Sequence, residues 1–149
     1  MAGAVTPRRV AGFPSRITDR DLSHAILTLE DLSGIDLSYA DFTGACLSGS
    51  DFTGADLSGA DLTGAGCADC TFVAAELRRA TLTGADLSGS QLINANMLSS
   101  SCTGADFRRA NLTGANCIGA DFTGADLTGA DFAFASTAFA TFSADAAQA

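Results

Sequence analysis

Two kinds of side chain in this sequence could carry chemistry, namely thiols and a single imidazole. Cys67 and Cys70 have the CxxC spacing of redox and metal-binding motifs, and His24 is the sole histidine. A structural zinc site needs four ligands, and the chain has no second CxxC. A lone histidine also gives no convincing Cys–His or Ser–His–Asp arrangement. We therefore expect no enzyme activity, no metal and no cofactor. Cys67 and Cys70 are interpreted as small buried hydrophobic residues, with a redox role as the alternative.

The charged residues indicate a strongly acidic surface. The chain has 17 acidic residues and eight basic ones, all of them Arg, which gives a net charge of −9. Residues 21–144 alone hold 15 acids and four Arg, a net charge of −11. Such a surface repels nucleic acid and anionic membranes, so a protein partner is favoured over both. Because neither a signal-peptide run nor a membrane-length apolar stretch is evident, we expect a cytoplasmic protein.

A repeat of five residues positions these side chains. Every fifth residue from Leu22 to Phe142 belongs to one series of 13 Leu, seven Phe, three Cys, Met97 and Thr137. Two positions before each member, 18 of 25 residues are Ala. Asp or Asn usually stands between the two, and Ser or Thr and then Gly usually follow. A register kept through 25 units indicates one structural unit written many times rather than disordered low complexity.

A period of five fits neither an α-helix nor a straight strand. Large residues five apart would spiral around a helix, and in a strand they would face opposite sides. A chain that bends once per unit instead points the large residue and the Ala inward. Stacked coils of such a chain can hydrogen-bond to one another about 4.8 Å apart. The sequence therefore predicts an all-β solenoid.

Several units carry a resemblance to a known family. ADLSG (55–59), ADLTG (60–64), ANLTG (110–114) and ADFTG (120–124) resemble the repeats of pentapeptide-repeat proteins. The resemblance implies a right-handed quadrilateral β-helix of about six coils, each made of four pentapeptides. The expected organisation is an N-terminal cap or flexible segment at 1–19, the repeat β-helix at 20–144 and a C-terminal tail at 145–149.

With four units per coil, residues twenty apart stack on one another, and outward Asp residues form ladders. Like charges about 4.8 Å apart repel by roughly 0.9 kcal/mol even in water. Asn could make the same turn contacts without this cost, so the preference for Asp suggests a partner surface, although solubility is an alternative reason. The candidate acidic surface consists of Asp86, Asp106, Asp121, Asp126 and Asp131.

The density of negative charge approaches that of DNA. A charge of −11 over roughly 30 Å is one charge per ~2.7 Å, against one per ~1.7 Å in duplex DNA. The resemblance points the same way, because the family includes quinolone-resistance proteins that mimic DNA and occupy DNA gyrase or topoisomerase IV. The unbroken register is similar to that of the loopless members. We therefore expect a non-enzymatic protein whose partner is a type II topoisomerase.

An apolar patch supports a different function, an adaptor or scaffold that binds an unrelated protein. Four apolar residues replace the usual Ser or Thr on adjacent faces, and two Arg lie one coil away. Neutral variation is the alternative, since β-branched residues suit strands. The candidate patch consists of Val73, Ile93, Leu98 and Ile118 with Arg78 and Arg79. The second Arg pair, Arg108 and Arg109, is expected only to decorate the opposite side.

The C-terminal end of the repeat region is rich in Phe. Phe132, Phe134, Phe139 and Phe142 lie within eleven residues, and the period directs Phe134 and Phe139 outward. Two interpretations remain open: an aromatic plug that caps a monomer, and an end-to-end homodimer through this end.

Overall fold

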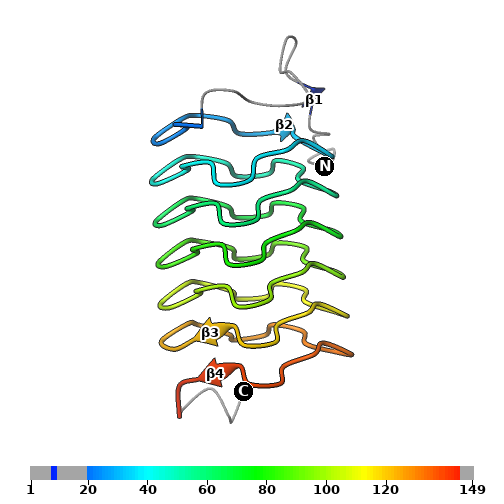
Figure 1. Cartoon of the computed structure of the whole chain (residues 1–149). Helices are drawn as coiled ribbons and strands as arrows, with labels where there is room; N and C mark the ends of the chain where they lie inside the picture. The colour runs from blue at the N-terminus through cyan, green and yellow to red at the C-terminus, as the bar shows by residue number, and fades with distance from the viewer. Residues whose placement is uncertain (1–7, 10–19, 145–149) are drawn as a thin grey trace, which may run out of the picture.

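The computed structural model describes residues 8–9 and 20–144, and they form a stack of coils without helices (Figure 1). Within these described residues there are four short strands: β1 (Arg8–Arg9), β2 (Glu30–Asp31), β3 (Asp121–Phe122) and β4 (Thr141–Phe142). β1 pairs with β2 and β3 pairs with β4, both in parallel. Apart from the backbone of β1, the expected N-terminal segment 1–19 lies outside the described residues, as does the tail 145–149.

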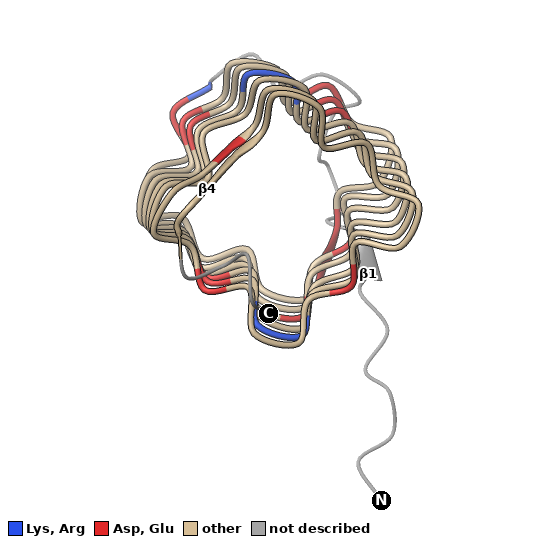
Figure 2. Ribbon diagram, turned by 90° about the horizontal axis from the view of Figure 1, so that it is seen from below, with Lys and Arg blue, Asp and Glu red and all other residues tan. Residues whose placement is uncertain are grey.

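Parallel bridges between residues twenty apart join each coil to the next. They run from Asp21↔Asp41 to Asn116↔Ser136 at intervals of five residues. Four five-residue units therefore separate vertical neighbours, and the coils superimpose when the stack is viewed along its length (Figure 2). The expected all-β solenoid is confirmed. Among the described residues no helix is long and apolar enough to cross a membrane.

The five-residue unit satisfies all five of its backbone N–H groups, as residues 40–44 illustrate. Asp41 donates to the preceding coil, whereas Phe42 and Gly44 donate to the following coil, at 2.7, 2.7 and 3.0 Å. Ala40 closes a turn by donating to the carbonyl three residues before it. The N–H of Thr43 has no backbone acceptor and donates to Asp41 Oδ1 at 2.8 Å. An Asp or Asn at this position therefore completes the unit, because buried or half-buried N–H groups need partners.

Each unit turns its corner through a left-handed residue, which explains the frequent Gly. Gly44 and Gly84 both have φ of +65°, a region that costs other L-residues about 1–2 kcal/mol. Eleven described non-Gly residues nevertheless adopt this conformation, among them Tyr39 and Arg79.

The core fills the interior of the stack with the large residue and the Ala of each unit. Leu87, Phe52 and Phe72 are fully buried, and the two rings stack with centroids 5.0 Å apart. Burying each such side chain contributes about 1.5–3 kcal/mol. Thr137, the one polar member of the series, is exposed in the last coil, where fewer neighbours cover the interior.

Candidate binding surfaces

The CxxC pair is a core element. Cys67 and Cys70 are both fully buried, and Cys70 Sγ donates to the Leu47 carbonyl at 3.0 Å. A hydrogen bond with Cys70, together with burial, raises the pKa of the Cys67 thiol well above its usual value. A thiol held protonated and away from solvent is a poor nucleophile or metal ligand, which supports the interpretation of both residues as small hydrophobic side chains.

His24 lies at an exposed corner, with its ring against Gly44. Within residues 8–9 and 20–144, no group of three His, Cys, Asp or Glu is arranged to hold a metal ion. The surfaces that can bind a partner are therefore built from carboxylates, guanidinium groups and exposed apolar side chains.

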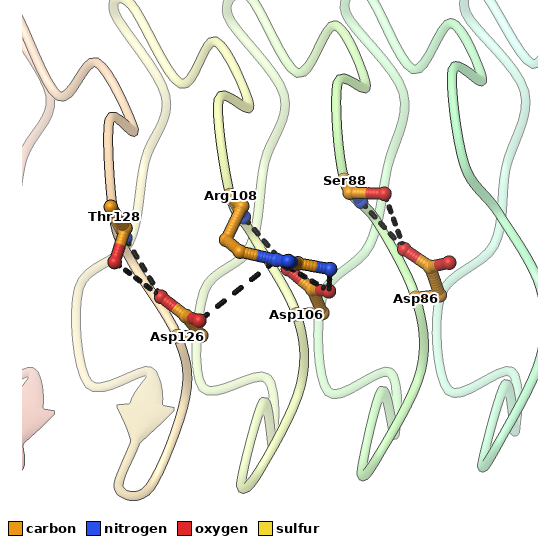
Figure 3. Close-up of polar contacts among 6 residues, drawn as sticks. All are labelled: Asp86, Ser88, Asp106, Arg108, Asp126 and Thr128. Atoms are coloured by element: carbon orange, nitrogen blue, oxygen red, sulfur yellow. Dashed lines mark hydrogen bonds and ion pairs between the residues drawn. The ribbon is translucent and has the colours of Figure 1, made fainter.

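Asp86, Asp106 and Asp126 form a single ladder, as the sequence predicts. Parallel bridges join Asp86 to Asp106 and Asp106 to Asp126. Each carboxylate accepts the N–H two residues later, at 2.9, 3.0 and 3.0 Å (Figure 3). Each Asp is thus both a turn cap and an outward charge.

Arg108 corrects the expectation that the second Arg pair only decorates the surface. Its guanidinium contacts both oxygens of Asp106, with Nη2 2.6 Å from Oδ2, and its Nε lies 3.9 Å from Asp126 Oδ2 (Figure 3). The hydrogen bond from Arg108 holds the pKa of Asp106 below its usual value. Arg108 therefore offsets part of the like-charge repulsion in this ladder.

The other two members of the candidate acidic surface lie on the neighbouring ladders. Asp121 bridges Ser101, and Asp131 bridges Asn111. Hydrogen bonds from Thr123, and from the Thr141 hydroxyl at 2.8 Å, lower the pKa of Asp121 to about 2. The five residues thus span three ladders toward the C-terminal end of the stack, and Figure 2 shows acidic residues on several sides of the ring.

The acidic positions are not uniform along the stack, which the sequence interpretation missed. On the ladder of Asp41 and Asp61, the next two members are Thr81 and Ser101, and acid returns only at Asp121. A tabulation of residues twenty apart would have shown this central gap.

The apolar patch is less accessible than expected. Val73, Ile93, Leu98 and Ile118 are all half-buried, because each side chain lies between outward residues of the coils before and after it. Backbone hydrogen bonds between adjacent coils place Val73 next to Ile93 and Leu98 next to Ile118, as the sequence predicts. The exposed large apolar residues lie elsewhere, in the first and last coils.

At the C-terminal end the four Phe residues divide into two pairs. Phe132 and Phe142 pack against Phe122 with centroids 5.7 and 5.3 Å from its ring. Phe134 and Phe139 are 92% and 90% exposed, which confirms their outward direction. Only the first pair packs against a core ring.

Sequence reasoning missed Tyr39, which is 75% exposed at the opposite end of the molecule. Its position two residues after a core Leu, where Gly is usual, was the available signal. A groove joins Tyr39 to the first Arg pair, with a volume of ≈ 370 Å³. Its walls consist of Tyr39, Ser58, Gly59, Arg78, Arg79 and Leu98.

Comparison with solved structures finds two pentapeptide repeat proteins and a fluoroquinolone resistance protein. A pentapeptide repeat protein (Rfr23) from the cyanobacterium Cyanothece 51142 is 20% identical, with a TM-score of 0.44 over 84% of this chain and 92% of that one. A pentapeptide repeat protein from the Arabidopsis thaliana thylakoid lumen is 32% identical, with a TM-score of 0.36 over 71% and 68%. QnrB1, a plasmid-mediated fluoroquinolone resistance protein, is 18% identical, with a TM-score of 0.47 over 85% and 79%.

Comparison with curated proteins finds no significant match. The profile of the family described as Pentapeptide repeats matches in eight copies, over residues 21–54, 31–65, 49–75, 55–97, 75–114 and 100–135. These matches together cover residues 21–135, most of the chain. The family fold they imply is a right-handed β-helix. This chain therefore belongs to the pentapeptide-repeat family.

Proposed function

We propose that this chain is a non-enzymatic, cytoplasmic protein-binding rod, a quadrilateral β-helix of about six coils that imitates DNA. Its acidic surface near the C-terminal end binds the DNA-binding surface of a type II topoisomerase, either DNA gyrase or topoisomerase IV. The observation that carries the proposal is negative charge beyond what the fold requires. Asn111 Oδ1 accepts the Thr113 N–H at 3.0 Å, which is the same turn bond that Asp51 makes with Thr53 at 2.8 Å. The fold needs the acceptor oxygen at this position and not the carboxylate charge.

Three of the carboxylates on this surface are held in the ionised form by hydrogen bonds. Hydrogen bonds lower the pKa values of Asp106, Asp121 and Asp126, with Arg108, Thr123 and Thr128 as the main donors. Residues 21–144 keep a net charge of −11 even with Arg108 counted. Over a rise of roughly 30 Å this is more than half the linear charge density of DNA, enough to attract a basic surface.

A supercoiling assay with purified DNA gyrase tests the proposal. We expect the wild-type protein to inhibit supercoiling at micromolar concentrations. The triple variant Asp121→Asn, Asp126→Asn and Asp131→Asn should relieve inhibition by about tenfold or more, because three charge contacts are lost while each turn bond remains. No inhibition by the wild-type protein at tens of micromolar would exclude the proposal.

The chain offers a matched control at the other end of the stack. Asp21→Asn, Asp41→Asn and Asp61→Asn remove the same charge from one N-terminal ladder and also preserve the turn acceptors. This variant should inhibit gyrase almost as well as the wild-type protein. Equal relief by both triple variants would mean that total charge, and not the C-terminal surface, is responsible.

We also propose that two rods associate end to end through Phe134 and Phe139. One monomer of roughly 30 Å spans only about nine base pairs at 3.4 Å each, so a dimer presents a more complete imitation of a DNA segment. The exposure of both rings at the last described corners supports this contact, because large exposed aromatic groups are typical of interfaces.

The alternative function, an adaptor that binds an unrelated protein through Val73, Ile93, Leu98 and Ile118, has weaker support. Its side chains are half-buried, so they offer a partner less apolar area than the sequence suggested.

A further inference from the structure

One groove differs in character from the acidic surface around it. It has a volume of ≈ 370 Å³, and its lining residues include Tyr39, Arg78, Arg79 and Leu98. It contains half of the four Arg in residues 21–144. The groove is therefore a local basic and aromatic site on an otherwise acidic surface.

The stacking of corners builds the groove. Tyr39, Gly59 and Arg79 occupy equivalent left-handed corners, with φ values of 59°, 66° and 56°. The Tyr39 ring leans over the equivalent corner of the next coil. A Cβ added to Gly59 at that corner would lie 2.5 Å from Tyr39 Cε1. Because Gly59 has no side chain, the Tyr39 ring can lie directly against its backbone. Arg79 occupies the equivalent corner one coil further along the stack.

The two guanidinium groups differ in their partners. Arg78 Nε lies 3.2 Å from Glu76 Oε2, which also accepts from Asn96 Nδ2 at 2.9 Å. Arg79 forms no ion pair with any residue that the structure describes. A surface guanidinium without a counter-charge can offer its full set of donors to a ligand, preferably a carboxylate or another planar anion.

The dimensions of the groove suit a short extended chain. From the corner of Tyr39 to that of Ser99 there are three coil steps of about 4.8 Å each, or roughly 14 Å. About four extended residues at ~3.3 Å each cover this distance. Tyr39 and the half-buried Leu98 line the same groove as both Arg residues and can offer apolar area to a ligand.

We propose that this groove binds a short, extended acidic segment of a partner protein. Carboxylates of the segment pair with Arg79 and Arg78, and an apolar side chain packs between Tyr39 and Leu98. A long polyanion such as nucleic acid would be repelled along the whole acidic stack, whereas a segment of about four residues meets only the carboxylates next to the groove, those of Asp56 and Glu76. This site is separate from the proposed topoisomerase surface, and neither proposal depends on the other.

The composition of the chain provides a local probe for the test. Tyr39 is the only tyrosine and there is no tryptophan, so ultraviolet-excited emission reports on the groove itself. We would titrate the full chain with a library of capped hexapeptides. Each peptide carries four Asp or Glu residues and one Leu or Phe and lacks aromatic residues that emit above 300 nm. Fluorescein-labelled copies allow anisotropy measurements in parallel. Members of the library should bind with micromolar affinity and change the Tyr39 emission, and increasing salt should weaken binding.

Two double variants form a matched pair. Arg78→Ser with Arg79→Gly restores the residues usual at these repeat positions, and Gly is compatible with the φ of 56° at position 79. Arg108→Ser with Arg109→Gly makes the same changes on the other Arg pair, where φ at position 109 is 59°. The first variant should bind peptides at least about tenfold more weakly, and the second should stay within about twofold of the wild-type protein.

Three outcomes would overturn the proposal. The first is that no peptide of the library binds more tightly than about 1 mM. The second is equal weakening by both double variants, which would show a general charge effect. The third is that a ten-nucleotide single-stranded DNA binds and changes Tyr39 emission while the peptides do not, which would assign the groove to nucleic acid.

Discussion

The Asp before each core residue performs two tasks at once. One oxygen accepts the N–H two residues later and often the hydroxyl of the same residue, as Asp51 does with Thr53 at 2.8 and 2.6 Å. The remaining charge faces solvent, where the same bond made by Asn111 shows that it is not needed for the turn. Folding thus accounts for the acceptor, and the charge is left for solubility or recognition.

The double role of Asp predicts how stability depends on pH. Hydrogen bonds lower the folded-state pKa of Asp21, Asp41 and Asp121 below the unfolded value near 3.9. Their stabilisation is therefore complete above about pH 5 and is lost as the pH falls toward the folded pKa, which for Asp121 is about 2. The urea midpoint of unfolding, followed by circular dichroism, should fall between pH 5 and pH 2.

Asp121→Asn serves as the control for this pH dependence. Asn keeps the acceptor but does not titrate, so the variant should lose less stability than the wild-type protein over the same range. A wild-type midpoint that rises below pH 4 would show that relief of charge repulsion outweighs the loss of these hydrogen bonds.

At the level of the five-residue element, the corners give the stack a direction. A non-Gly side chain at a corner leans over the equivalent corner of the next coil, twenty residues later, and a Gly usually stands there. His24 lies over Gly44, Tyr39 over Gly59 and Arg109 against Gly129. Two constraints favour Gly at such a corner. Its φ is left-handed, and the side chain that covers it leaves little room for a Cβ.

Ala substitutions at two corners distinguish the effect of the left-handed φ from the effect of the covering side chain. Gly59→Ala and Gly64→Ala should each reduce the free energy of unfolding by about 1 kcal/mol, because φ is 66° and 65°. A Cβ at position 64 meets nothing within 4 Å, whereas one at position 59 displaces the Tyr39 ring. Only Gly59→Ala should therefore change the near-ultraviolet circular dichroism of Tyr39. An unchanged spectrum in that variant would contradict the packing described here.

In the whole molecule, repetition makes the two ends different from the middle. Leu22 and Leu27 in the first coil are half-buried, and Phe142 in the last is 39% exposed, whereas the core residues of the series from Leu32 to Leu127 are buried. Phe134 and Phe139 stand at the last described corners, and no described corner follows for them to cover. These rings are the contact that we propose for a second copy of the chain.

Light scattering after size-exclusion chromatography tests the proposed dimer. The wild-type protein should have twice the mass of the 15.0 kDa chain. Phe134→Gly with Phe139→Gly removes both rings but suits φ of 59° at each corner, so it should yield a folded monomer. Tyr39→Gly removes an exposed ring at the opposite end and should remain dimeric. A monomeric wild-type protein at 100 μM would exclude the dimer.

Much of the architecture was predictable from the sequence because each unit repeats the same local interactions. The period of five, the inward direction of Leu87 and Cys67, and the turn bond of Asp all follow from contacts within a unit or between identical units twenty residues apart. The outward direction of Phe134 and Phe139 was predictable for the same reason.

Between the two end coils, the sequence alone determined which residues are core, corner and surface, since a strict period gives equivalent positions the same environment. Only the tertiary structure decided which surface residues act together. Side chains at the corners lean along the stack, so Tyr39 covers Gly59 and shares a groove with Arg79, forty residues away in the chain. Arg108 likewise contacts Asp106 and Asp126, although its side chain remains 55% exposed. The period fixes where a side chain starts, but its direction depends on packing and charge in the neighbouring coils.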